Sequence, residues 1–384
     1  MDQKRIPFNK PYLTGKEAHY MYDAVYSGKI SGNGKYTQKS QAFFEDRYGF
    51  KKCLLTSSCT DALEMAAILL DIRQGDEVIL PSYTFVSTAN AFALHGANLI
   101  FTDSREDHPG IDENNIEHLI TSKTKAIVVV HYAGVAVDMD KIVQIANKHN
   151  LYIVEDAAHA IDSFYINKKN EKIPLGSIGH LAAFSFHETK NIISGEGGML
   201  VINDEKFQRR SEIIWEKGTN RSEFFRGEVD KYGWVDIGSS FLPSDIVAGF
   251  LFAQLEHLDE IQEIRRSIWN TYYKNLAEIN SCKFDLPRIP EYSTNNAHMF
   301  FLVCKSSEIR DKLIGYLKEN HVQAVFHYLS LHKSPYFKNK YKGKKLYYSD
   351  LYSDRLVRLP FYNELSYPEI NEITDLIREF DEKY

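Results

Sequence analysis

Short apolar runs alternate with helix-length stretches through residues 52–202. Four of the runs contain no polar residue, which is typical of strands buried on both faces: Val78–Leu80, Leu99–Phe101, Ala126–Val130 and Tyr152–Val154. The segments between them, such as Met139–His149, are long enough to form helices. This alternation predicts an α/β fold with a mostly parallel sheet whose strands are joined by helical crossovers.

The pattern changes beyond residue 250. A charged, periodic stretch predicts a helix over residues 258–277, and Pro287 and Pro290 then interrupt the backbone. The segments that follow predict a strand over 299–303, a helix over 308–319, a strand over 322–326 and a last helix over 367–380. We therefore expect a large domain over residues 1–250 and a smaller α/β domain over residues 251–384.

The composition disfavours several classes of protein. The formal net charge is -6 and the sequence pI is about 6.2, which argues against a nucleic-acid-binding protein. The four cysteines form no CxxC pair and no metal-binding spacing, so free thiols in a reducing cytoplasm are expected. The first residues have no apolar signal core and no apolar run reaches the length of a membrane span, so a soluble cytoplasmic protein is expected.

One lysine stands between two predicted strands. Lys190 follows the apolar run Ala182–Phe186 and precedes a glycine-dense turn and the run Gly198–Ile202. A lysine in that place is partly withdrawn from water, which lowers its pKa and makes its amine a nucleophile. The alternative is a solvated loop lysine, which this segment alone favours because most lysines are exposed.

Two segments further upstream fit the same chemistry. Asp156 falls at the carboxyl end of a predicted strand, where ligands of α/β sheets bind and where a carboxylate can keep a pyridine nitrogen protonated. Residues Ser57–Thr60 separate a strand-like run from a helical pattern, so backbone N–H groups and the helix dipole offer a phosphate site. Ordinary helix capping is the alternative for both segments.

Together these residues resemble the DegT-type nucleotide-sugar aminotransferases, which have the aspartate-aminotransferase fold and use pyridoxal 5′-phosphate. The resemblance runs nearly end to end and is also carried by Ile6–Pro11, Gly75–Asn90 and Phe326–His332. The string Lys217–Lys231, with Asp236–Ser240 after it, resembles the transaminases that convert dTDP-4-keto-6-deoxyglucose into dTDP-4-amino-4,6-dideoxygalactose.

The resemblance implies roles for individual residues. Lys190 matches the Schiff-base lysine, and Asp156 matches the partner of the pyridine nitrogen. The other cofactor contacts that it implies are Cys59, Thr60 and Ser185 at the phosphate, Phe85 stacked on the ring, and His159 beside the ring. Ser240 stands where the family commonly has an asparagine that reaches the cofactor phosphate of the partner subunit, and a serine can donate one hydrogen bond over a shorter reach.

Cationic side chains in the string Lys217–Lys231 suit the two phosphates of a sugar nucleotide. The candidate substrate contacts are Lys217, Asn220 and Arg221 in this string, together with His327. A solvated loop is the alternative for the string. The resemblance implies that it crosses a dimer interface, so we expect a homodimer with shared active sites.

The implied reaction is a transamination with L-glutamate as amino donor and a dTDP-4-keto-6-deoxyhexose as acceptor. Lys190 is expected to act as general base and then as general acid. The sequence leaves open amination at C3 and the 4-amino-4,6-dideoxyglucose product. A non-catalytic sensor or regulator on the same fold is a further alternative, which the joint presence of Lys190, Asp156 and the Ser58–Thr60 turn disfavours.

Overall fold

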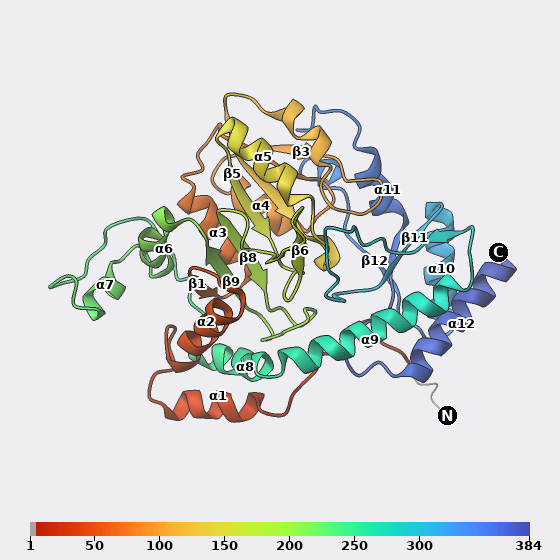
Figure 1. Cartoon of the computed structure of the whole chain (residues 1–384), viewed down its shortest axis with the longest axis horizontal. Helices are drawn as coiled ribbons and strands as arrows, with labels where there is room; N and C mark the ends of the chain where they lie inside the picture. The colour runs from red at the N-terminus through yellow and green to blue at the C-terminus, as the bar shows by residue number, and fades with distance from the viewer. Residues whose placement is uncertain (1–4) are drawn as a thin grey trace.

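The computed structural model describes residues 5–384 (Figure 1). Residues 1–4 lie outside the described residues, and the expectation about a signal segment falls partly on them. None of the helices within residues 5–384 combines the length and the apolar character that a membrane crossing requires.

A seven-stranded sheet forms the centre of the molecule, with the strand order β1-β9-β8-β5-β4-β2-β3 (Figure 1). Its strands are β1 Cys53–Thr56, β2 Glu77–Pro81, β3 Asn98–Thr102, β4 Thr124–Val130, β5 Tyr152–Asp156, β8 Leu181–Ser185 and β9 Gly198–Ile202. β2 pairs in parallel with β3 and β4, and β5 pairs in parallel with β4 and β8. β9 runs antiparallel to both of its neighbours, β1 and β8. The predicted mostly parallel sheet is therefore confirmed.

Alternate side chains of one strand enter two different cores, which explains the unbroken apolar runs. In β4, Ile127 and Val129 pack in a core that includes residues of helix α5 (Met139–His149). Ala126 and Val128 face the other way, into a core that includes residues of helix α3 (Cys59–Leu69). All four are fully buried, because helices cover both faces of the sheet. Polar side chains are therefore concentrated at the strand ends.

A second sheet of four antiparallel strands is built later in the chain, in the order β10-β11-β13-β12. Its strands are β10 Phe284–Asp285, β11 Phe301–Cys304, β12 Val325–Phe326 and β13 Leu356–Arg358. β11 and β12 correspond to the strands expected over 299–303 and 322–326, although β12 is only two residues long. The sequence analysis missed β13 and the preceding helix α11 (Tyr347–Arg355). The domain division near residue 250 stays a prediction.

Helix α9 (Leu258–Ala277) has the expected bounds and extends in Figure 1 from α8 (Asp245–Leu255) towards α12 (Tyr367–Lys383). Its first turn contributes Leu258 to a core of the seven-stranded sheet, whereas Tyr272 packs in the core of the second sheet. One helix therefore contacts the cores of both sheets. Helix α12 ends three residues later than the expected end at residue 380.

The other helices are shorter. They are α1 Glu17–Tyr26, α2 Lys35–Tyr48, α4 Val86–Ala93, α6 Gln208–Trp215, α7 Arg221–Phe225 and α10 Ser307–Glu319. Five single turns of 3₁₀ helix are η1 Glu113–Asn115, η2 Glu117–Leu119, η3 Tyr132–Gly134, η4 Glu205–Phe207 and η5 Leu331–Lys333. A hairpin of β6 (Phe164–Ile166) and β7 (Lys172–Pro174) completes the described elements.

Residues 216–240 project from the body as an arm that carries α7 (Figure 1). Backbone bridges between Glu216 and Ser240 and between Thr219 and Trp234 join the two halves of the arm. At its base, Gly218 has a φ of 76°, and a Cβ there would collide with the carbonyl oxygen of Asp236. The close approach of the two halves therefore requires a glycine at this position.

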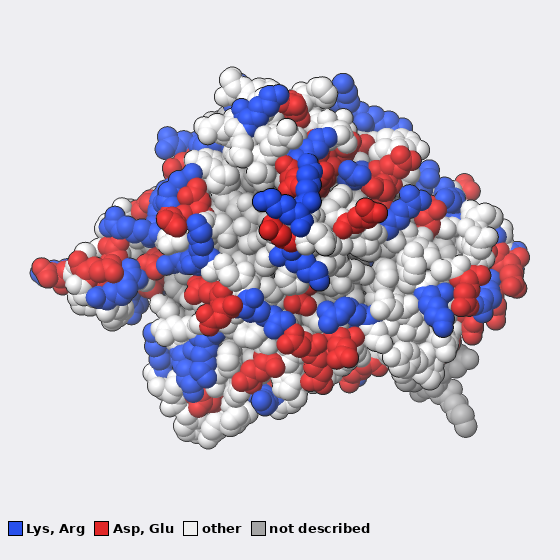
Figure 2. All heavy atoms as spheres, in the orientation of Figure 1, with Lys and Arg blue, Asp and Glu red and all other residues white. Residues whose placement is uncertain are grey.

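Charged side chains of both signs are mixed across the face shown in Figure 2, the arm included. Neighbouring blue and red groups on this face reflect a chain with a net charge of -6. This face of the described residues presents no broad basic surface of the kind that binds a nucleic-acid backbone.

Candidate active site

A cavity of about 500 Å³ lies where several parallel strands of the large sheet end. Val130, Asp156 and Ser185 are the last residues of β4, β5 and β8, and all three line it. Its lining contains eight of the predicted site residues, namely Cys59, Thr60, Phe85, Asp156, His159, Ser185, Lys190 and His327. A larger cavity of about 730 Å³ lies between β3 and residues 336–346 and contains none of them. The smaller cavity is therefore the candidate site.

Lys190 reaches this cavity from the turn that follows β8. Its backbone N–H donates to the carbonyl of His187 at 2.9 Å, which fixes the turn. Burial lowers the pKa of Lys190 to about 8, and the positive charge of Arg358 acts in the same direction. The negative charges of Cys59 and Asp156 oppose that shift without cancelling it. A large fraction of the amine is therefore neutral near physiological pH and able to act as a nucleophile or a base.

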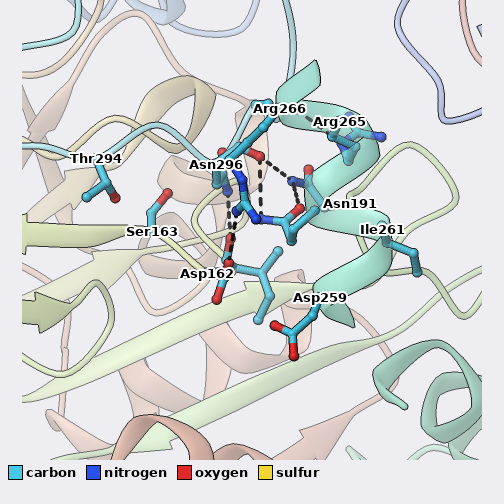
Figure 3. Close-up of polar contacts among 12 residues, drawn as sticks. Asp162, Ser163, Asn191, Asp259, Ile261, Arg265, Arg266, Thr294 and Asn296 are labelled. Carbon is cyan, nitrogen blue, oxygen red and sulfur yellow. Dashed lines mark hydrogen bonds and ion pairs between the residues drawn. The ribbon is translucent and has the colours of Figure 1, made fainter. Parts of the chain in front are cut away.

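The next residue, Asn191, anchors the lysine turn to helix α9 and to residues 296–298 (Figure 3). Its Nδ2 donates to Gln262 Oε1 at 2.8 Å and to the carbonyl oxygen of Asn296 at 2.9 Å. Its Oδ1 lies 2.8 Å from Nδ1 of His298. Because Asn191 is buried and fully engaged, the backbone beside Lys190 has little freedom to move.

Asp156 is buried at the end of β5 and accepts two hydrogen bonds. Thr88 Oγ1 donates to Oδ2 at 2.7 Å, and the backbone N–H of Ala158 donates to Oδ1 at 3.2 Å. Burial raises the pKa of Asp156, while the two hydrogen bonds and the charge of Lys190 act against that rise. A carboxylate has about four acceptor positions, so Asp156 can still accept from a protonated ring nitrogen in the cavity. Such a donor would favour the charged form of Asp156.

Stacked rings form one wall of the cavity. His159 stacks on His298 at 4.1 Å between ring centroids, and His327 stacks on Tyr328 at 3.5 Å. Burial holds the pKa of all three histidines well below the usual range, and the charges of Lys190 and Arg358 add to the effect. The backbone N–H of Ala133 donates to His159 Nδ1 at 3.2 Å, so the proton of neutral His159 is on Nε2. This wall is therefore uncharged.

The amino end of helix α3 forms the opposite part of the cavity. Ser58 caps the helix by accepting from the backbone N–H of Asp61 at 3.1 Å. Thr60 Oγ1 donates to Ser87 Oγ at 2.8 Å. A Cβ on Gly198 of β9 would collide with the backbone of Ser58, so a glycine is required beside this turn. The free N–H groups and the positive end of an 11-residue helix suit a phosphate group.

These features fit the pyridoxal phosphate that the resemblance implies. The phosphate-binding turn and the carboxylate of Asp156 both line the cavity, together with the amine of Lys190. Phe85 also lines it and is 53% exposed, so its ring is free to stack on a flat ligand. A ligand that carries a phosphate, a basic ring nitrogen and an aldehyde would find a matching group for each.

The remaining predicted residues lie elsewhere. Lys217, Asn220, Arg221 and Ser240 belong to the arm and do not line the cavity of the single chain. Asn220 Oδ1 accepts the backbone N–H of Gly233 at 2.8 Å, and the Arg221 guanidinium lies 5.1 Å from the ring centre of Phe225. Their roles in binding stay predictions.

The structure adds residues that the sequence analysis missed. Thr88, Asn191, His298 and Arg358 line the cavity or hold its groups in place. One signal was available, because Arg358 is a lone charge in the apolar run Leu356–Leu359. Tyr328 was considered with His327 but not selected, and its φ of 52° is a strained conformation of the kind found at functional sites.

Comparisons with known proteins agree with this site. Residues 11–378 match the model of the DegT/DnrJ/EryC1/StrS aminotransferase family. The chain is 33% identical to GDP-perosamine synthase of Escherichia coli O157:H7, over 98% of this chain and 99% of the relative. It is 30% identical to the spore coat polysaccharide biosynthesis protein SpsC of Bacillus subtilis, over 99% and 98% of the two chains.

A solved structure gives the same result for the fold. The PLP form of Spr1654 from Streptococcus pneumoniae is 25% identical and superimposes with a TM-score of 0.89, with 99% of each chain covered. The α/β aminotransferase fold predicted from the sequence is thereby confirmed. The chain belongs to the DegT/DnrJ/EryC1/StrS aminotransferase family.

Proposed function

We propose that this aminotransferase moves the amino group of L-glutamate to dTDP-4-keto-6-deoxyglucose and so forms dTDP-4-amino-4,6-dideoxygalactose. The cofactor is pyridoxal 5′-phosphate, as in the PLP form of Spr1654. The observation that carries the transamination is the buried Lys190 amine, with its pKa lowered to about 8, in one cavity with Asp156 and the amino end of α3. The choice of sugar rests on the resemblance of the string 217–231.

The protein residues divide the work of holding the cofactor. Pyridoxal phosphate supplies an aldehyde that binds amines and a ring that accepts electrons from carbon. Backbone N–H groups at the start of α3, with the side chains of Thr60 and Ser185, would hold its phosphate. Asp156 would keep the ring nitrogen protonated, and Phe85 would cover one face of the ring.

Lys190 then performs the proton transfers. Its Nζ takes the proton from the α-carbon of the amino donor, and in the second half-reaction it delivers a proton to the sugar carbon that receives the amine. A pKa of about 8 suits both directions, because the neutral and charged forms are both well populated near pH 7–8. The uncharged histidine wall leaves Lys190 as the base of this cavity, since burial also keeps Asp156 engaged in its own hydrogen bonds.

We also propose a homodimer in which the arm of one subunit completes the cavity of the other. Large apolar side chains on the arm are exposed, with Trp234 at 83% and Phe225 at 69%. Such a cluster is costly in water and is typical of a surface that a partner covers. In that arrangement Lys217, Asn220 and Arg221 would meet the phosphates of the sugar nucleotide, and Ser240 the cofactor phosphate.

The nucleotide and the position of the new amine are tested together. Purified enzyme with L-glutamate is offered the dTDP-linked and the GDP-linked 4-keto-6-deoxyhexose, because the 33% identical relative is a GDP-perosamine synthase. We expect turnover of the dTDP sugar and an NMR spectrum with an axial amine at C4. Turnover of the GDP sugar alone, an equatorial amine, or an amine at C3 would each replace the proposed product.

Two properties of the whole chain complete the proposal. We propose a cofactor-binding domain over residues 1–250 and a smaller domain over residues 251–384, which limited proteolysis with a first cut near residue 250 would support. A first cut inside either range would contradict it. We further propose a cytoplasmic enzyme, since its four cysteines are free thiols. Recovery of the protein from another cell fraction would contradict that location.

A further inference from the structure

Arg358 is a cation in the cavity that has no assigned role. It ends β13 of the second sheet, where it pairs with Phe301 of β11 and Val325 of β12. Its side chain lines the same cavity as Lys190 and Asp156. The second sheet therefore contributes one charged group to a site whose other predicted residues, apart from His327, come from the seven-stranded sheet and its turns.

Within residues 5–384, no acceptor satisfies this guanidinium. Its Nε is buried without a hydrogen-bond partner, and no carboxylate of the described chain forms an ion pair with it. The Phe8 ring, at 4.7 Å from the guanidinium carbon, is a weak substitute for a negative charge. Burial lowers the pKa of Arg358, and the nearest opposing influences are the hydroxyls of Tyr132, Tyr328 and Tyr83. A buried cation without an anion is costly, so its presence points to a bound anion.

A comparison with Arg265 shows how this chain stabilises a buried arginine that has a structural role. Arg265 donates to the carbonyl oxygens of Ala297 at 3.1 Å and His298 at 2.6 Å, and to Asn363 Oδ1 at 3.1 Å. Its five donors are largely used within the protein. Arg358 makes no such bonds among the described residues, so its donors remain available to a ligand in the cavity.

We propose that Arg358 binds the α-carboxylate of the amino donor in a bidentate pair. This inference rests on the proposed function, because it requires an amino acid to enter the cavity. The amine of the donor must reach the carbon that Lys190 Nζ also reaches, and the α-carboxylate sits on the carbon next to that amine. Arg358 lies close enough to lower the pKa of Lys190, which places its charge where this carboxylate arrives.

The diphosphate of the sugar nucleotide is the other anion that enters the site. It is separated from the reacting keto carbon by several bonds of the sugar ring, so it lies further from Lys190 than the donor carboxylate does. The cofactor phosphate has the amino end of α3 as its partner, and no group of that turn is among the electrostatic neighbours of Arg358. The donor carboxylate is the anion that the position of Arg358 fits.

The test pairs an enzyme variant with a donor variant. L-glutamate and 4-aminobutyrate differ only in the α-carboxylate, and each is reacted with the holoenzyme in the absence of sugar, with the cofactor absorbance as the signal. For Arg358→Gln we expect the apparent Kd for glutamate to rise about 100-fold, since a bidentate charged pair is lost. The apparent Kd for 4-aminobutyrate should change less than about threefold. Arg358→Lys should restore part of the glutamate affinity, as a point charge without the planar fork.

A second measurement separates this proposal from its alternatives. Calorimetric binding of dTDP should be unchanged in Arg358→Gln, whereas weakened dTDP binding with normal glutamate affinity would assign Arg358 to the diphosphate instead. An equal loss for both donors would make Arg358 a structural residue and overturn the proposal. The matched control is Arg265→Gln, which should lower the melting temperature while the ratio of the two donor affinities stays at the wild-type value.

Failure of the proposed function gives a different result. If the wild-type holoenzyme reacts with glutamate but does not aminate the dTDP sugar, the sugar assignment is wrong and the test of Arg358 proceeds unchanged. If another amino acid replaces glutamate as donor, the same comparison uses that amino acid and its decarboxylated analogue.

Discussion

The cavity and the arm both carry predicted site residues, yet the chain treats them in opposite ways. Around the cavity, contacts within one chain fix each group, such as the hydrogen bond from Thr88 to Asp156 and the three bonds of Asn191 beside Lys190. On the arm, Trp234 is 83% exposed and the predicted phosphate contacts meet no cavity. One chain therefore builds the chemistry, while the arm needs a further surface.

The difference has a physical origin in the backbone. Strand ends of a sheet with two buried faces are held by hydrogen bonds on both sides and by two packed cores. The arm is joined to itself by two bridges and carries one five-residue helix, so few buried contacts define its position. Segments of that kind sit at the low end of local stability until a partner orders them.

The most severe way to disable the cavity is Lys190→Ala. We expect kcat to fall by about 10⁴-fold or more, because the variant loses both the covalent attachment and the proton carrier. Cofactor bound without a covalent link would remain detectable by absorbance. The control is Lys51→Ala, which removes an exposed lysine from an ion pair with Glu205. More than about one hundredth of wild-type turnover in Lys190→Ala would contradict the role of this amine.

A smaller loss is expected from Asp156→Asn. The amide keeps the size of the side chain but no longer stabilises a protonated ring nitrogen, so kcat should fall by about 10²–10³-fold. Thr88→Val tests the same group from outside, by removing the 2.7 Å hydrogen bond to Asp156. Its effect should be about tenfold or less. An effect of Thr88→Val larger than that of Asp156→Asn would mean that Asp156 is not the group that acts on the ring.

The arm is tested by mixing two inactive variants. Lys190→Ala has a defective cavity, and the double variant Lys217→Ala/Arg221→Ala has a defective arm. If arms serve the partner's cavity, refolding the two together in equal amounts should recover about a quarter of wild-type activity, because half of the dimers contain one intact cavity with one intact arm. Activity that stays at the sum of the separate variants would show that the arm serves its own chain. Sedimentation of the Trp234→Ser variant checks whether the dimer depends on the exposed aromatic side chains.

The fold was predictable from sequence where two packed faces impose a pattern. β4 and β5 lie between two cores, so unbroken apolar runs identified them and, through them, the parallel sheet. β13 is three residues long and contains Arg358, and α11 before it has no continuous apolar stripe. Neither element carries a period that distinguishes it from a loop, and only the pairing of β13 with β11 and β12 defines it.

The candidate site was predictable to the same extent. Asp156 and the Ser58–Thr60 turn follow strands directly, so their place at the sheet edge follows from local sequence. Asn191 and Arg358 were missed because their importance lies in contacts with segments far away in the chain, such as the contact of Asn191 with Gln262. Local patterns contain no information on such pairs.

The finest distinction within the cavity is the ionisation of Lys190. In cofactor-free protein, its reaction with acetic anhydride, followed by peptide mass mapping, should rise about tenfold per pH unit and level off near pH 8, because the neutral amine is the reactive form. Arg358→Gln should move this midpoint upward, since a positive charge that disfavours the ammonium form is removed. Asp156→Asn should move it downward, because a negative charge that favours the ammonium form is lost. Arg221→Ala should leave it in place, and a shift there would show that the arm reaches the cavity of its own chain.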